Sequence, residues 1–225
     1  MSKIALGTVQ FGIDYGINSV DGRVRLEEVK RIFSHAHLKG INLLDTAPAY
    51  GDSEKILGRM DISNFKVVTK TRHFDSLEIK NNDVKLLNND FYHSLEDLKQ
   101  DSVYGVLMHN ADDLLKPGAE KLYDHLQELK QAEKIEKIGV SVYDYSQLQS
   151  ILDNFDIDLV QLPFNILDRR MIDSGMLSTL RSSNTEVHAR SVFLQGLLLM
   201  SEQNRPDKFN RWSGLWKIWH EWLND

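Results

Sequence analysis

Seven short apolar runs, separated by segments with helical periodicity, constrain the fold of this chain more than any other feature of its sequence. The runs are residues 4–8, 41–47, 66–71, 103–109, 137–142, 159–165 and 187–193. Each run is rich in Val, Ile or Leu and is apolar at consecutive positions, which is typical of strands buried on both faces of a parallel sheet. Strand followed by helix, repeated along the chain, predicts an α/β fold.

The segments between these runs predict amphipathic helices. Between the first two runs, apolar residues recur at three- and four-residue steps, and Gly40 is placed to end the helix. These apolar residues are Leu26, Val29, Ile32, Phe33 and Ala36. Before the fifth run, a stripe of leucines at helical spacing predicts a second helix of this kind. The stripe consists of Leu122, Leu126 and Leu129.

Ser53 and Ser146 stand where helix N-caps are expected. The pattern of strands and helices alone is compatible with a barrel and with an open doubly wound sheet. A chain of 225 residues is long enough for one α/β barrel, so we expect a single domain over residues 1–225.

The charge and cysteine content narrow the range of partners. The formal net charge is −6, which argues against nucleic acid as the main partner, because binding phosphates requires a basic surface. The chain has no cysteine, so disulfides and Cys-ligated metals are excluded. The histidines show no spacing typical of a metal site, and we expect none. No stretch approaches the roughly 18 apolar residues of a membrane span, so a cytoplasmic protein is expected.

Four candidate catalytic residues lie at or just after the ends of three neighbouring runs. Asp45 and Tyr50 come at and after the end of the second run, Lys70 closes the third, and His109 ends the fourth. In a barrel the carboxyl ends of the strands carry the chemistry. Taken singly, each residue also fits a structural role: a capping carboxylate, a tyrosine packed at the mouth, a lysine at the rim and a structural histidine.

Together, the four residues suit proton transfer to a carbonyl group. A lysine ammonium beside a phenol is expected to lower the pKa of Tyr50 towards neutrality. Asp45 would hold Lys70 in place and charged, and a neutral His109 would hydrogen-bond a substrate carbonyl. The chain has no hydride donor of its own, so such a reduction implies a nicotinamide cofactor.

These residues and their neighbours resemble the aldo-keto reductase family in order and spacing, from residue 3 to about residue 200. The segments that carry the resemblance are Leu6-Gly7-Thr8, Phe11-Gly12, Asp45-Thr46-Ala47, Tyr50-Gly51, Lys70, Leu107-Met108-His109, Gly139-Val140-Ser141, residues 160–165 and Ala189-Arg190-Ser191. The resemblance implies a (β/α)8 TIM barrel, reversible NAD(P)-dependent carbonyl reduction, and Tyr50 as the proton donor.

The resemblance also implies a cofactor site, for NADP with NAD as the alternative. Its residues would be Gly7, Thr8, Asp45, Ser141, Gln161, Arg190 and Ser191. Of these, Ser141 and Gln161 would hold the nicotinamide carboxamide. Two positions depart from the family pattern. Val142 follows Ser141 where Asn is usual, and Arg190-Ser191 stands where many members have an aromatic residue that stacks on the nicotinamide.

The C-terminal part departs further from the family pattern. Family members usually have an eighth strand and a following helix that grip the adenosine phosphate, but no eighth apolar run follows residue 193. We therefore expect an incomplete barrel of about seven units with two open edges. The last residues predict a helix with one aromatic face, formed by Trp212, Leu215, Trp216, Trp219 and Trp222. Packing on the core is expected for this face. The alternatives are cover for the barrel gap, contact with a second copy in a homo-oligomer, and continuation into a longer protein.

The leading functional hypothesis is an NAD(P)H-dependent oxidoreductase that reduces aldehyde, ketone or sugar-like carbonyls. A second hypothesis is a non-catalytic barrel that acts as a binding or regulatory subunit, or a member with impaired cofactor binding. A phosphate-handling barrel lyase or isomerase fits the fold equally well but lacks a matching phosphate loop, and it ranks last.

Overall fold

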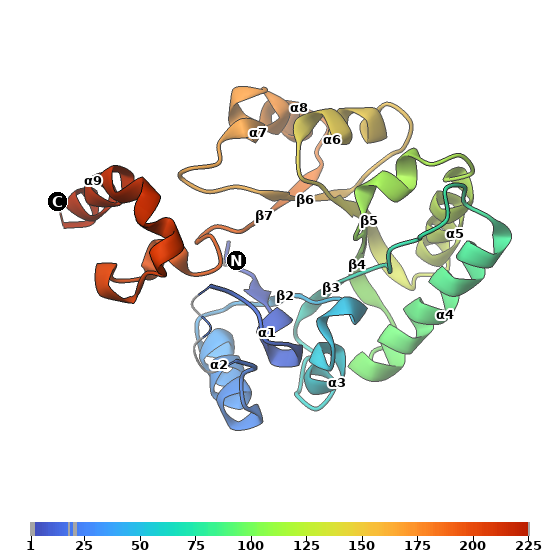
Figure 1. Cartoon of the computed structure of the whole chain (residues 1–225). Helices are drawn as coiled ribbons and strands as arrows, with labels where there is room; N and C mark the ends of the chain where they lie inside the picture. Colours follow the sequence, from blue (N-terminus) through green and yellow to red (C-terminus); the bar gives the residue numbers. More distant parts are fainter. Residues whose placement is uncertain (1–2, 18, 20–21, 225) are drawn as a thin grey trace.

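The computed structural model describes residues 3–17, 19 and 22–224 of the chain. Seven strands form one parallel sheet in chain order. They are β1 (Leu6–Gly7), β2 (Leu43–Asp45), β3 (Lys66–Lys70), β4 (Val103–Met108), β5 (Ile135–Ser141), β6 (Leu159–Pro163) and β7 (Glu186–Arg190). The sheet curls, and helices lie on its outer side (Figure 1). The α/β fold and the incomplete barrel are confirmed, because a doubly wound sheet would not keep its strands in chain order.

Helices connect successive strands and continue after β7. They are α1 (Val9–Gly12), α2 (Leu26–Leu38), α3 (Ser53–Leu57), α4 (Asn81–Leu98), α5 (Glu120–Gln131), α6 (Tyr145–Leu152), α7 (Arg170–Asp173), α8 (Met176–Ser182) and α9 (Ser213–Asn224). Short 3-10 turns cover Pro48–Tyr50, Ala111–Leu115, Leu197–Leu199, Glu202–Asn204 and Asp207–Trp212. In the described part of the chain, no helix has both the length and the apolar character needed to cross a bilayer.

The two amphipathic helices predicted from periodicity are confirmed. In α2, Val29, Phe33 and Ala36 are buried, and the chain leaves the helix through Gly40, whose φ of +68° favours glycine. In α5, the leucine stripe is buried as a set; its members are Leu122, Leu126 and Leu129.

Both predicted serine N-caps are wrong. Ser53 is the first residue of α3 after the cap position at Asp52, and its hydroxyl donates to the carbonyl oxygen of Thr8 (3.0 Å). At α6 the cap is Asp144, whose carboxylate accepts from the backbone N–H of Gln147 (2.9 Å). The carboxylate two residues earlier is a stronger acceptor than the Ser146 hydroxyl, which itself donates to Asp144 (2.7 Å).

The two faces of the sheet are packed by different clusters. Alternate residues of a strand point to opposite faces, and the larger cluster fills the space between the sheet and the helices. The opposite face carries a smaller cluster formed by Val68, Tyr104, Leu107 and Leu159. Gly139 leaves room there, because a Cβ at this position would lie 2.5 Å from Leu107 Cδ2. The inner face is therefore close-packed beneath the carboxyl ends of the strands.

In the described residues, β1 and β7 are the two edges of the sheet. β1 is shorter than the predicted run 4–8, and β7 is shifted from the predicted run 187–193. Val187 of β7 is 37% exposed. Each edge strand has a neighbour on one side only, so fewer backbone hydrogen bonds define its ends. The expectation of strands buried on both faces is therefore wrong for β7.

The aromatic face of α9 packs on the preceding turns rather than on the main core. Trp216 is buried in a small separate cluster with Leu197, Leu198 and Met200. Trp222, by contrast, is 59% exposed, and α9 stands apart from the other helices in Figure 1. The prediction of core packing is thus met only by a local cluster, and association with a second copy stays a prediction.

Leu107→Ala should lower the free energy of unfolding by about 2–5 kcal/mol, because it leaves a cavity in the inner cluster. Leu38→Ala, at an 81% exposed position of α2, is the matched control and should change it by less than about 0.5 kcal/mol. Urea unfolding followed by circular dichroism measures both. Equal effects of the two substitutions would contradict the assignment of Leu107 to the core.

Candidate active site

Pairing of neighbouring strands brings three of the predicted catalytic residues to one end of the sheet. Asp45 ends β2 and Lys70 ends β3, while His109 directly follows β4. The register pairs Asp45 with Val68 and Lys70 with Leu107. Two-residue alternation places Lys70 on the same face as Val68, and His109 on the same face as Leu107. The three side chains therefore lie on the inner face, above the inner cluster.

Lys70 and Asp45 form a buried ion pair. Lys70 Nζ lies 2.7 Å from Asp45 Oδ1 and donates to the Thr46 carbonyl oxygen at 2.9 Å, and only 1% of the lysine side chain is exposed. Gln161 Nε2 donates to the same Asp45 oxygen (2.6 Å). The predicted pairing of Lys70 with Asp45 is confirmed, and it is what allows an ammonium group to be buried.

Close backbone contact with Gly12 fixes the turn that carries Tyr50. A Cβ at Gly12 would lie 1.6 Å from the Tyr50 carbonyl oxygen, so only glycine fits there. Gly51, which directly follows Tyr50, has a φ of +59°, a conformation that favours glycine. Lys70 Nζ lies 4.8 Å from the Tyr50 ring centroid, and the His109 ring meets the Tyr50 ring edge to face at 6.0 Å. The structure thus brings all four predicted residues together.

A buried network of hydroxyl groups supports Asp45 from behind. The Thr8 hydroxyl donates to the Asp45 carbonyl oxygen (2.9 Å) and lies 2.8 Å from the Ser53 hydroxyl. The Ser53 hydroxyl accepts a hydrogen bond from the Thr46 hydroxyl (3.2 Å). Thr8 is fully buried, so the structure places it behind the wall where the resemblance implied a cofactor contact. Sequence reasoning missed the role of Ser53, since a serine after Tyr50-Gly51 also looks like a helix cap.

Burial decides the protonation of the two aromatic groups. Burial raises the pKa of Tyr50, and the opposing effect of Lys70 does not outweigh it. The expectation of a phenol pKa lowered towards neutrality is therefore wrong, and Tyr50 stays protonated at neutral pH. Burial, followed by the charge of Lys70, lowers the pKa of His109 from 6.5 to about 4. The neutral His109 that was predicted is thus the form present at pH 7.

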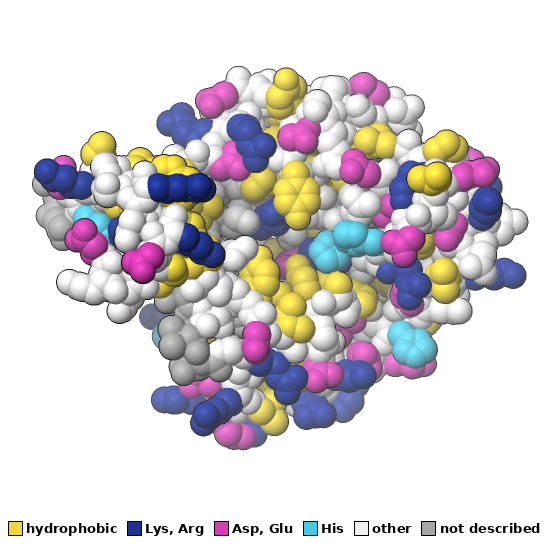
Figure 2. All heavy atoms as spheres, viewed as in Figure 1, with side chains coloured by type: hydrophobic (Ala, Val, Ile, Leu, Met, Phe, Trp, Pro, Cys, Tyr) yellow, Lys and Arg dark blue, Asp and Glu magenta, His cyan; other side chains and the backbone are white. Residues whose placement is uncertain are grey.

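Asp45, Tyr50 and His109 open into a cavity of about 630 Å³. Figure 2 shows hydrophobic and histidine side chains around a hollow near the centre of this face. Most of the predicted cofactor residues share its wall: Gly7, Asp45, Ser141, Gln161, Arg190 and Ser191. The Nδ1 atom of His109 is buried and has no hydrogen-bond partner within the part of the chain that the structure describes.

A model of the aldo/keto reductase family matches residues 3–217 of the chain. The chain belongs to the aldo-keto reductase family. It is similar to the NADH-specific methylglyoxal reductase of Escherichia coli, with 30% identity over 219 residues that cover 88% of this chain and 65% of that protein. It is also similar to the aldo-keto reductase YhdN of Bacillus subtilis, with 30% identity over 186 residues that cover 77% and 53%. The chain thus spans about half to two thirds of the length of these two relatives.

A solved structure of an aldo-keto reductase from Bacillus halodurans, in its holo form, shares the fold. The TM-score is 0.71 at 21% identity, and the match covers 92% of this chain and 66% of the other. The fold similarity agrees with the order of the seven strands described above.

The wall of the cavity in this aldo-keto reductase contains features that sequence reasoning missed. Tyr143 stacks under the guanidinium of Arg190, whose carbon lies 4.3 Å from the ring centroid. The segment after β7 reverses direction through three non-glycine residues with positive φ, namely Ser191, Leu194 and Gln195. Such residues carry little sequence signal, because their conformation comes from the fold around them.

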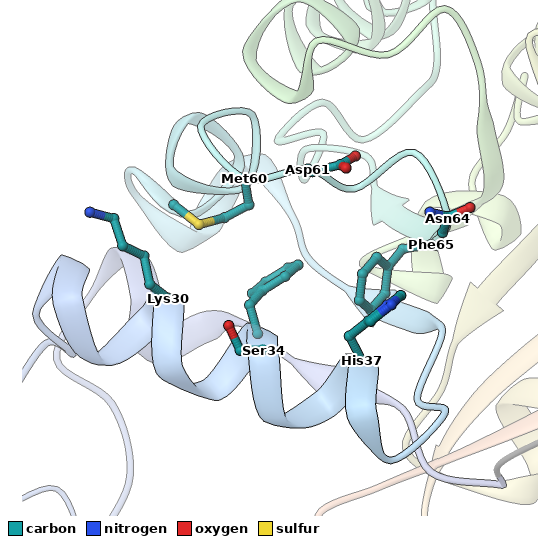
Figure 3. Close-up of a pocket in the computed structure, with 8 residues that line it drawn as sticks. Lys30, Ser34, His37, Met60, Asp61, Asn64 and Phe65 are labelled. Atoms are coloured by element: carbon teal, nitrogen blue, oxygen red, sulfur yellow. The ribbon is translucent and has the colours of Figure 1, made fainter.

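A second hollow, of about 360 Å³, lies outside the curled sheet of this aldo-keto reductase (Figure 3). Lys30, Ser34 and His37 of α2 line one side of it, and Met60, Asp61 and Phe65 line the other. In its lining, Phe65 contacts Phe33 (5.1 Å between ring centroids) and His37 (6.4 Å). Among the described residues no group of three or more His, Cys, Asp or Glu is placed to hold a metal.

The imidazole signal of His109 should titrate with a pKa of about 4 in proton NMR, and His109→Gln should remove that signal. Between pH 6.5 and 4 the unfolded chain binds a proton at this residue that the folded chain does not, so stability should fall as the pH falls through this window. The pH dependence of urea unfolding should therefore be shallower in His109→Gln. A titration at or above pH 6.5 would show that the imidazole is not buried as described.

Asp45→Asn should lower the free energy of unfolding by about 3–5 kcal/mol, because the buried ammonium of Lys70 loses its carboxylate. The double variant Asp45→Asn/Lys70→Met should recover most of this loss. Asp52→Asn removes a half-exposed partner of Arg23 and should cost less than about 1 kcal/mol. Similar losses from Asp45→Asn and Asp52→Asn in urea unfolding would contradict the importance of the buried pair.

Proposed function

We propose that this protein catalyses the nicotinamide-dependent reduction of an aldehyde, ketone or sugar-like carbonyl, with Tyr50 as the proton donor. The observation that carries the proposal is the position of Asp45, Tyr50, Lys70 and His109 at one end of the sheet, beside the cavity of about 630 Å³. Three of them line that cavity, and the fourth, Lys70, is buried against Asp45.

Tyr50 would supply the proton. Its raised pKa keeps the phenol protonated at neutral pH, which is the form needed to protonate an oxygen that gains negative charge. The ammonium of Lys70, 4.8 Å from the ring centroid, would stabilise the phenolate that remains. Asp45 keeps that ammonium in position through the 2.7 Å ion pair.

His109 would orient the substrate. Neutral imidazole carries one N–H donor, which can hydrogen-bond the carbonyl oxygen while Tyr50 approaches the same oxygen. His109 lines the cavity, so its ring is placed beside a bound substrate. The edge-to-face arrangement at 6.0 Å places the two rings on the same part of the wall.

A nicotinamide cofactor supplies the hydride when it is bound. The cavity wall fits its carboxamide, because Ser141 offers a hydroxyl and Gln161 offers an amide oxygen. The Nε2 atom of Gln161 already donates to Asp45. Gly7 and Ser191 would line the cofactor. Backbone N–H groups of the turn over residues 191–196, in which Ser191, Leu194, Gln195 and Gly196 have positive φ, would suit phosphate oxygens. Thr8 would act through Asp45 instead of touching the cofactor. NADP is the proposed cofactor, with NAD as the alternative suggested by the name of the Escherichia coli relative.

Tyr50→Phe should lower kcat/KM by about 100- to 10,000-fold, because the proton donor is removed while the ring remains. The substrate panel should include methylglyoxal, from the name of the Escherichia coli relative, with NADPH and NADH each as reductant. Cofactor dissociation constants, measured by NAD(P)H fluorescence, should stay unchanged in the variant.

Tyr145→Phe is the matched control, because Tyr145 is 52% exposed on α6 and lies off the cavity wall. If Tyr50→Phe were as active as this control, the assignment of Tyr50 as proton donor would be contradicted. Absence of NADPH and NADH binding up to millimolar concentrations would overturn the catalytic proposal in favour of a non-catalytic barrel.

A further inference from the structure

The charges on the cavity wall are not balanced. Among the described residues that line it, Asp45 is the one carboxylate and Arg190 is the one guanidinium. The charge of Asp45 is offset by Lys70 at 2.7 Å, and the lowered pKa of His109 leaves the imidazole neutral. The cavity therefore presents one uncompensated positive charge, that of Arg190.

Arg190 has no ion-pair partner within 4.0 Å among the residues that the structure describes. The nearby carboxylate of Asp168 is held by Arg170 through two hydrogen bonds of 2.9 and 2.8 Å. A half-buried guanidinium without a carboxylate is uncommon, because removing it from water has a cost that a counter-charge normally offsets. An anion in the cavity would supply that counter-charge.

The guanidinium is held in a fixed orientation. It lies 4.3 Å from the ring centroid of Tyr143, and one of its nitrogens donates to the Val142 carbonyl oxygen at 3.0 Å. Arginine has five N–H donors, and this backbone bond uses one of them. A planar fork already held by a ring and a carbonyl binds a carboxylate with little further loss of side-chain entropy.

The charge of Arg190 is close enough to the reacting groups to affect them, since it contributes to the lowering of the pKa of His109. A molecule that reaches both His109 and Arg190 would place its carbonyl at one end of the cavity and an anionic group at the other. We propose that Arg190 forms an anion-binding subsite and that the site reduces carbonyl compounds that carry a carboxylate. This assignment rests on the proposed function, and it gives Arg190 to the substrate instead of the cofactor.

The first test compares succinic semialdehyde, which carries a carboxylate, with its methyl ester, which has the same carbonyl and no charge. The wild type should prefer the acid in kcat/KM, and Arg190→Gln should reduce the acid-to-ester ratio by about tenfold to hundredfold. Arg190→Lys should keep part of the preference, because it keeps the charge. Arg181→Gln, at an exposed position of α8 off the cavity wall, is the matched control and should leave the ratio unchanged. An acid-to-ester ratio that Arg190→Gln leaves intact would overturn the proposal.

Cofactor binding separates the two sources of an anion. For each of NADH and NADPH, the dissociation constant should be unchanged between the wild type and Arg190→Gln. If both cofactors bind about tenfold more weakly to Arg190→Gln while the acid-to-ester ratio is unchanged, Arg190 binds cofactor phosphates and the substrate assignment is wrong.

A binding measurement keeps the subsite testable even where no carbonyl is reduced. Calorimetry with butanoate and butanamide needs no turnover, and the wild type should prefer butanoate while Arg190→Gln should not. Loss of all turnover with retention of this preference would reject the proposed reaction but support the subsite. Equal binding of both compounds by the wild type would reject the subsite.

Discussion

The buried ion pair between Lys70 and Asp45 is the contact on which the geometry of the candidate site depends. A lysine with 1% of its side chain exposed is tolerated only because a carboxylate and a backbone carbonyl accept its hydrogen bonds. The pairing requires β2 and β3 to keep their register, and the hydroxyl network of Thr8 and Ser53 keeps the Asp45 backbone in place. The sheet therefore determines where the ammonium lies, 4.8 Å from the centroid of the Tyr50 ring.

The same burial leaves the two aromatic groups uncharged at neutral pH. The Tyr50 phenol keeps its proton, and the His109 imidazole carries only one proton. Two neutral rings therefore lie beside the ion pair of Lys70 and Asp45. The remaining charge of the cavity lies on Arg190, which is not one of these four residues. The proposed proton donor and the proposed anion subsite thus occupy different parts of one wall.

The sequence predicts the parts of this arrangement that follow from chain order. Apolar runs give seven strands in sequence, and parallel pairing then brings Asp45, Lys70 and His109 together without any further information. The direction of the Tyr50 pKa could not be predicted, because it is a balance between burial and charge that requires the surrounding atoms. The buried position of Thr8 follows from a hydroxyl network with Ser53, which lies 45 residues away in the chain. Contacts of this range leave no periodic signal.

The two open edges of the sheet also have a consequence for local unfolding. Two residue pairs join β1 to β2, and five join β4 to β5. Strand pairing is therefore more extensive in the middle of the sheet than at the β1 edge. Backbone amides near β1 are then expected to exchange with solvent through smaller openings than those of β4 and β5. Asp45 lies on the second strand from that edge, and Thr8, directly after β1, donates to its carbonyl oxygen, so opening of β1 alone would remove this hydrogen bond from behind the ion pair.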